Sequence, residues 1–79
     1  MPVVFRAQGY TLFYSNEGNP REPLHVHVRK GAAVAMFWLY PEVCLAESYG
    51  LNGQEQGTLA GIVAARRQEI EEAWHGFFS

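Results

Sequence analysis

The sequence predicts an α+β protein: a four-stranded antiparallel sheet with one face covered by a long C-terminal helix. Three observations lead to this fold class. The first half is rich in β-branched and aromatic residues, residues 24–30 alternate strictly between apolar and polar, and the last third repeats apolar residues every three or four positions. A chain of 79 residues has room for one hydrophobic core, so we expect residues 1–79 to form a single domain.

Four segments of the N-terminal half have strand character. They cover about residues 3–8, 10–15, 24–30 and 32–39, and glycines separate the first from the second and the third from the fourth. The last of the four is almost entirely apolar, which favours a central strand that is buried on both faces. Residues 15–23 are rich in Asn, Gly and Pro and predict a loop.

The C-terminal half predicts one long helix over about residues 53–78. Asn52 can cap its N-terminus, with Glu55 reaching back as in a capping box. The apolar stripe consists of Leu59, Ile62, Val63, Ile70, Ala73, Trp74 and Phe77. Residues 41–48 are ambiguous, because a proline near the start and a glycine beyond the end suit a helical turn, whereas apolar alternation suits a strand. We favour the helical turn.

Charge is distributed unevenly along the chain. The net charge is −2, but residues 1–40 carry four basic and two acidic side chains (+2), whereas residues 41–79 carry two basic and six acidic ones (−4). A mildly basic sheet beside an acidic helix is therefore expected. An ordinary solvated surface would have the same composition.

The single cysteine, Cys44, bears on the compartment. One cysteine cannot form a disulfide within the chain, which fits a reducing environment, and we expect it to be a small buried hydrophobic residue. The sequence shows no signal segment and no apolar run of about 20 residues, so we expect a cytoplasmic protein that does not enter a membrane. A chain this small can gain stability by forming a homo-oligomer.

His25 and His27 are the most informative polar residues. Two positions apart on a strand, they point to the same side, with Cα atoms about 6.5–7 Å apart. Two imidazoles at this spacing can bind one metal ion, or act as acid and base around a phosphate. They can also be ordinary polar residues on the wet face of a half-buried strand.

The acid–base interpretation is supported by neighbouring cations. Cleavage of RNA by its own 2′-hydroxyl needs a base, an acid and a cation, and requires no metal or cofactor. Arg29 lies on the same strand face as the histidines, Arg6 and Lys30 are nearby candidates, Arg21 can clamp a backbone phosphate, and Trp38 can stack on a base.

The metal interpretation lacks an obvious third ligand. His75 is the only other histidine, and it belongs to the helix that we expect on the opposite face of the sheet. Glu17, in the loop before the third strand, is the easier carboxylate partner. We therefore predict no metal site as the main function.

Several motifs together resemble a known family. They are Tyr14 to Glu17, Pro23 to Val28, Phe37 to Leu39, Glu72 to His75, and Phe77-Phe78. In this order they are similar to domain-of-unknown-function family 4160, a family of small bacterial and archaeal proteins. Members are often encoded beside another small domain, in pairs that look like toxin–antitoxin modules. The resemblance implies a small protein partner encoded nearby, and carries functional importance over to Glu17, His25, His27, Trp38 and Trp74.

The chain departs from the family pattern at three places. Leu24 replaces a second proline, Tyr40-Pro41 stands where the family often has Asp-Pro, and His75 stands where it often has Asn. The second change removes a carboxylate, and the third counts against a metal site made of three histidines.

These observations lead to one main hypothesis and two alternatives. The main hypothesis is a toxin–antitoxin component acting as a metal-independent endoribonuclease, with His25, His27 and Arg29 as catalytic residues. The residues expected to take part in binding are Glu17, Arg6, Arg21, Lys30 and Trp38. One alternative is a non-enzymatic protein-binding module, an antitoxin or regulator, that uses Phe78 and the acidic helix surface. The other is a small metal-binding protein.

Overall fold

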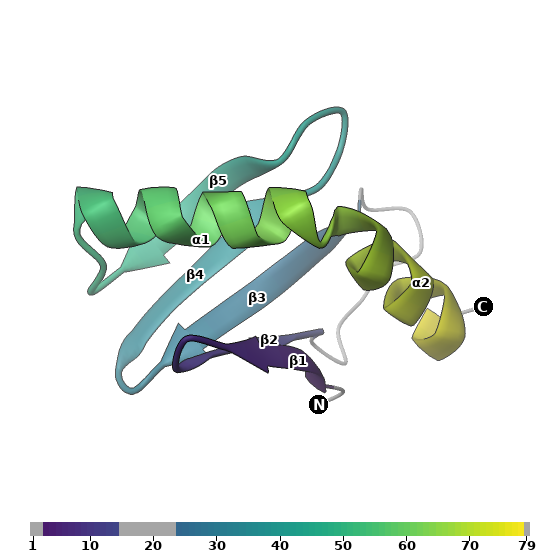
Figure 1. Cartoon of the computed structure of the whole chain (residues 1–79), viewed down its shortest axis with the longest axis horizontal. Coiled ribbons are helices and arrows are strands. Elements are labelled where there is room, and N and C mark those ends of the chain that lie inside the picture. The colour runs from purple at the N-terminus through teal and green to yellow at the C-terminus, as the bar shows by residue number, and fades with distance from the viewer. Residues whose placement is uncertain (1–2, 15–23, 79) are drawn as a thin grey trace.

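The computed structural model describes residues 3–14 and 24–78, except the side chains of Phe77 and Phe78. Over these residues a five-stranded antiparallel sheet is followed by two helices (Figure 1). The strands are joined in chain order, and each pairs with the next. The elements are β1 (Val3–Ala7), β2 (Tyr10–Phe13), β3 (His25–Lys30), β4 (Ala33–Trp38), β5 (Cys44–Tyr49), α1 (Gly53–Ala65) and α2 (Arg67–Phe78).

Two tight turns set the register of the first four strands. Ala7 pairs with Tyr10 across a turn in which Gln8 and Gly9 both have positive φ, the requirement of a type I′ turn. Lys30 pairs with Ala33 across Gly31, whose φ is +60°. These turns match the right-handed twist of the strands they join.

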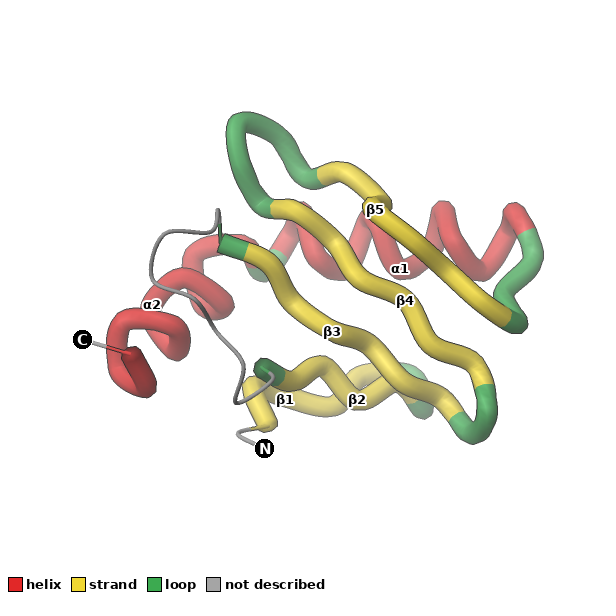
Figure 2. Tube along the Cα trace, turned by 180° about the vertical axis from the view of Figure 1, so that it is seen from behind, coloured by secondary structure: helices red, strands yellow, loops and turns green. Residues whose placement is uncertain are grey.

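The two faces of the sheet differ sharply. Except at the register shifts in the β1–β2 and β4–β5 ladders, side chains alternate along the strands, and every second residue points towards α1, which lies across one face (Figure 1). The other face is seen from the front in Figure 2, with the helices behind the sheet. The core between sheet and helices consists of Phe5, Tyr10, Leu12, Tyr14, Leu24, Val26, Val28, Ala35, Phe37, Leu39, Leu59, Val63 and Ile70.

The α+β class is confirmed, but the number of strands is five, not four. The expected helical turn over residues 41–48 is wrong, because Cys44–Tyr49 forms the edge strand β5, paired with β4. A register shift between Met36 and Phe37 interrupts this ladder. The irregularity disturbs the apolar alternation that normally identifies a strand.

The single helix over residues 53–78 is also wrong, because the helix breaks at Arg66. Arg66 has φ −113° and ψ 23°, which ends α1, and α2 starts at the next residue. The Arg66 guanidinium lies 3.5 Å from the centre of the Phe5 ring and pairs with Glu69 at 2.8 Å. The change of direction lets α2 pass the end of the sheet instead of continuing along α1 (Figure 1).

Other local predictions have mixed outcomes. The capping box at the start of α1 is confirmed: the Glu55 amide donates to Asn52 Oδ1 at 2.8 Å, and the Asn52 amide donates to Glu55 Oε1 at 3.1 Å. The segment 32–39 forms an interior strand, as expected, because β4 lies between β3 and β5. It is not buried on both faces, since Val34 is exposed and Met36 and Trp38 are half-buried. Cys44 is exposed, not buried.

No helix of the described residues is long and apolar enough to cross a membrane.

Candidate nucleic-acid interface

The face of the sheet opposite α1 carries most of the polar residues singled out in the sequence. Cross-strand pairing places Phe13, His27, Met36 and Glu47 in one row across β2, β3, β4 and β5. We call this surface the open face. Because residues i and i+2 of a strand share a face, His25 belongs to it as well.

The two histidines point to the same side of β3, as expected, but His25 is buried there against Trp74 of α2, the helix that we expected on the opposite face. The ring centres of the two histidines lie 5.3 Å apart, and the rings meet edge to face. Val26 and Val28, which alternate with them, are buried on the α1 side. The period-two pattern of β3 therefore separates a core face from an imidazole face.

Aromatic and cationic groups extend this pair in both directions. The His27 ring stacks on Phe13 with centres 5.5 Å apart, and the Arg29 guanidinium lies 5.4 Å from the centre of the same ring. On the other side, the His25 ring meets Trp38 at 5.2 Å. We call this continuous series the imidazole ladder: Arg29, Phe13, His27, His25 and Trp38.

The two histidines differ in accessibility. His25 is only 8% exposed, because Trp38 of β4 and Trp74 of α2 enclose it. His27 is half-buried, farther from α2 and nearer the centre of the open face. Of the two rings, His27 is therefore the more accessible from the open face.

The basic residues do not all lie beside the histidines. Arg29 and Arg6 are exposed and share a row, because each pairs with Thr11 from opposite sides of β2. Lys30 belongs to the α1 side of β3, and its ammonium lies 4.8 Å from the centre of the Tyr10 ring. The open face thus combines His27 with Arg29 and Arg6, whereas Lys30 stands apart at a corner of the sheet.

The remaining predicted site residues have different outcomes. Trp38 joins the ladder, whereas Glu17 and Arg21 lie outside the described residues. His75 is exposed on α2. Within the described part of the chain, no group of three His, Cys, Asp or Glu side chains is placed to hold a metal ion.

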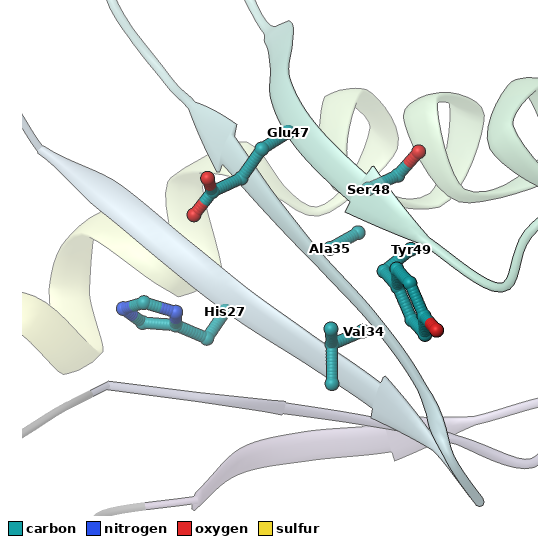
Figure 3. Close-up of a pocket in the computed structure, with 6 residues that line it drawn as sticks. All are labelled: His27, Val34, Ala35, Glu47, Ser48 and Tyr49. Atoms are coloured by element: carbon teal, nitrogen blue, oxygen red, sulfur yellow. The ribbon is translucent and has the colours of Figure 1, made fainter.

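A hollow of about 390 Å³ lies on the open face next to His27. Figure 3 shows the Glu47 carboxylate extending from β5 towards the side of His27, with Val34 and the Tyr49 ring farther along the sheet. Glu47 and Tyr49 were missed in the sequence because they lie on β5, which we expected to be helical. The alternation of Val43 and Leu45 signals a strand, but continued along the chain it would put Glu47 on the covered face, because the register shift lies between the pairs of Leu45 and Glu47.

The C-terminal helix supports this arrangement from the end of the sheet. The Tyr14 hydroxyl donates a hydrogen bond to the Ile70 carbonyl oxygen, and its ring meets Trp74 edge to face at 5.3 Å. Burial raises the pKa of the Tyr14 phenol well above its usual range, and the negative charge of Glu71 raises it further. Tyr14 therefore stays neutral and fixes α2 at the position from which Trp74 contacts His25.

Fold and site together define a small α+β protein with an open-faced antiparallel sheet that carries histidines, aromatic rings and arginines. The chain belongs to the family described as Domain of unknown function (DUF4160), whose model matches residues 10–75. This match confirms the resemblance seen in the sequence, and it includes every residue of the imidazole ladder. No curated protein and no solved structure matches the chain significantly.

Proposed function

We propose that this protein binds single-stranded RNA across the open face and cleaves it without a metal ion, as a cytoplasmic component of a toxin–antitoxin pair. The observation that carries the proposal is the imidazole ladder. It places two titratable rings, two half-buried aromatic rings and a guanidinium in unbroken contact on a face that α1 leaves uncovered.

Binding follows from the composition of this face. Single strands are held by stacking of bases on aromatic side chains, and by cations that follow the phosphates. Phe13 and Trp38 provide the aromatic surface on β2 and β4, while Arg29 and Arg6 provide charge along one row of the sheet. The chain as a whole is acidic, so binding depends on this local concentration of positive charge.

The proposed reaction needs only side chains. A neutral imidazole removes the proton from the ribose 2′-hydroxyl, and the oxygen attacks the adjacent phosphorus. The bond to the 5′-oxygen breaks, a protonated imidazole supplies the proton that this oxygen takes up, and a 2′,3′-cyclic phosphate remains. His27 is the accessible base in this scheme, His25 is the second proton-transfer group, and Arg29 offsets the charge on the phosphate.

Cleavage of a fluorescent RNA oligonucleotide by the pure protein in EDTA tests the proposal. Replacing His27→Ala should lower the rate by about 10²–10⁴-fold, the usual contribution of general acid–base catalysis. His25→Ala should have a similar effect, and His75→Ala, on the exposed side of α2, is the matched control. Products should carry a 2′,3′-cyclic phosphate. Wild-type protein without activity, or His27→Ala with the wild-type rate, would refute the proposal.

The second candidate is a non-enzymatic module that binds a small protein partner. The exposed edge strand β5 favours it, because an unpaired edge can accept another strand. Tyr49 is 74% exposed there, next to Val34 at 43%. Of the surfaces expected from the sequence, the acidic one is already engaged within the helix region, because Glu71 accepts from Tyr40 and Arg67. The side chain of Phe78 lies outside the described residues.

Co-purification with the product of the adjacent reading frame tests this second function. A stable complex that Tyr49→Ser weakens and His27→Ala leaves intact would support binding through β5. A complex that neither change affects would place the contact elsewhere. Metal analysis after mild purification tests the metal-binding alternative, which requires a stoichiometric amount of zinc.

A further inference from the structure

The hollow on the open face has the dimensions of a small-ligand site. Its volume of about 390 Å³ lies within the range of about 300–1,000 Å³ that is usual for ligand pockets. His27 on β3 and Glu47 on β5 are separated by β4, so their backbones stand about 10 Å apart. A flat heterocycle can lie over the surface between them.

Glu47 is the acidic residue among those that line this hollow. Among the described residues, no side chain forms an ion pair or hydrogen bond with its carboxylate. An ionised carboxylate offers two acceptor oxygens and no donor. It therefore favours a ligand that presents two adjacent N–H donors.

Tyr49 is the aromatic surface of the hollow. Its ring is 74% exposed and lies beside Val34, with which it pairs across β4 and β5 (Figure 3). Neighbouring Ser48 faces the other way, since its hydroxyl accepts from Gln56 of α1 at 3.0 Å. The register of β5 thus turns both Glu47 and Tyr49 towards the open face.

From these features we propose that the hollow is a base-binding subsite selective for guanine. Guanine presents N1–H and the 2-amino group side by side, which match the two oxygens of Glu47. Adenine, cytosine and uracil each place a lone pair beside their donor, and that lone pair would face the carboxylate unfavourably. The inference rests on the proposed RNA-binding function and specifies which base that function would select. In this arrangement, a guanine that lies over Tyr49 would have its own ribose and phosphate near His27.

Binding to RNA that cannot be cleaved tests the subsite separately from catalysis. We suggest fluorescence anisotropy with 2′-O-methyl pentamers of uridine in which the central base is guanine, adenine, cytosine or hypoxanthine. The guanine pentamer should bind at least about fivefold more tightly than the others, as expected for a two-point hydrogen-bond match. Hypoxanthine, which lacks the 2-amino group, should lose most of this advantage.

Protein variants locate the selectivity. Glu47→Gln should abolish the preference for guanine, because the amide replaces one acceptor with a donor, whereas Glu42→Gln in the preceding exposed segment is the matched control. Tyr49→Ser should weaken all four pentamers alike. Equal affinity for the four bases, or a preference that Glu47→Gln retains, would overturn the inference.

Three further results separate this inference from its alternatives. Selective binding of guanine without cleavage of ordinary RNA would uphold the subsite and refute the endoribonuclease. Guanosine monophosphate that displaces the pentamer with equal affinity would uphold guanine recognition and assign it to a free nucleotide. Concentration-dependent self-association that Tyr49→Ser abolishes, without any pentamer binding, would overturn the subsite in favour of a protein interface.

Discussion

The covered face and the open face of the sheet are built from alternate residues of the same strands. On β4, Phe37 is completely buried under the helices, whereas the next residue, Trp38, is half-buried against His25 on the opposite side. Each strand thus supplies the core with one set of side chains and the candidate site with the other. In a 79-residue protein with little interior, this division lets a functional surface exist without using core positions.

The largest expected effect comes from exchanging these two neighbours for alanine. Phe37→Ala should lower the free energy of unfolding by about 3–5 kcal/mol, because it leaves a cavity in the core. Trp38→Ala should lower it by about 1–2 kcal/mol, since its ring is already partly solvated. Urea unfolding followed by far-ultraviolet circular dichroism measures both.

The effects on RNA affinity should follow the reverse order. Trp38→Ala should lose RNA affinity while it remains folded, whereas the folded fraction of Phe37→Ala should still bind. Equal losses of stability in the two variants would mean that the open face is as much a part of the core as the covered one.

The second prediction tests the aromatic centre of the open face. Phe13→Ala should weaken binding of single-stranded RNA by about 1–3 kcal/mol, the usual contribution of an aromatic side chain that stacks on a base. It also removes the ring that His27 and Arg29 contact. Anisotropy titration with a labelled oligonucleotide measures the change.

The control lies one residue earlier, on the covered face. Leu12 is completely buried, and Leu12→Val should reduce stability by about 1 kcal/mol without changing RNA affinity. If both substitutions weakened binding equally, the two faces would not be functionally distinct.

The third prediction concerns Tyr14, at the place where α2 joins the sheet. Tyr14→Phe removes the hydrogen bond to Ile70 and should lower stability by about 0.5–1.5 kcal/mol at neutral pH. The pKa of Tyr14 is raised in the folded protein, above the value of about 10 in the unfolded chain. Its contribution is therefore fully present below about pH 10 and is lost as the pH rises through the folded pKa.

Chemical denaturation between pH 8 and 11 measures this dependence. The difference in stability between the wild type and Tyr14→Phe should shrink above about pH 10. A constant difference over the whole range would show that the phenol ionises equally in both states.

Much of the open face could be predicted from the sequence, because residues 24–29 alternate between apolar and polar. Val26 and Val28 identify the core side, and so the positions of His25 and His27 followed from the pleat alone. The capping box at Asn52 was equally predictable, since it depends on residues three positions apart. Local periodicity sufficed wherever the element itself was regular.

The parts that could not be predicted depend on contacts between distant segments. No glycine or proline marks the break at Arg66. The break coincides with contact between Arg66 and Phe5 and with the hydrogen bond between Ile70 and Tyr14. The strand β5 has mostly exposed residues and an irregular register, so its pairing with β4 identifies it better than its own pattern does. Glu47 was missed for the same reason.

The smallest expected effect is at Glu71, on the part of α2 that belongs to neither face. Its carboxylate accepts from Tyr40 and from Arg67, the latter at 3.2 Å. Glu71→Gln should reduce stability by only about 0.3–0.5 kcal/mol, as for other helical pairs four residues apart. The hydrogen bond to Glu71 is the main reason that the pKa of Tyr40 is raised, so the substitution should move that pKa back towards its ordinary value.

Absorbance at 295 nm during alkaline titration measures this shift, with Tyr40→Phe as the reference that identifies the signal. RNA binding should not change, because Glu71 lies outside the imidazole ladder. Weaker binding by Glu71→Gln would instead show that α2 transmits its position to the open face, through the contact of Trp74 with His25. In that case α2 would couple the covered face to the open face, and the two faces of the sheet would not be functionally independent.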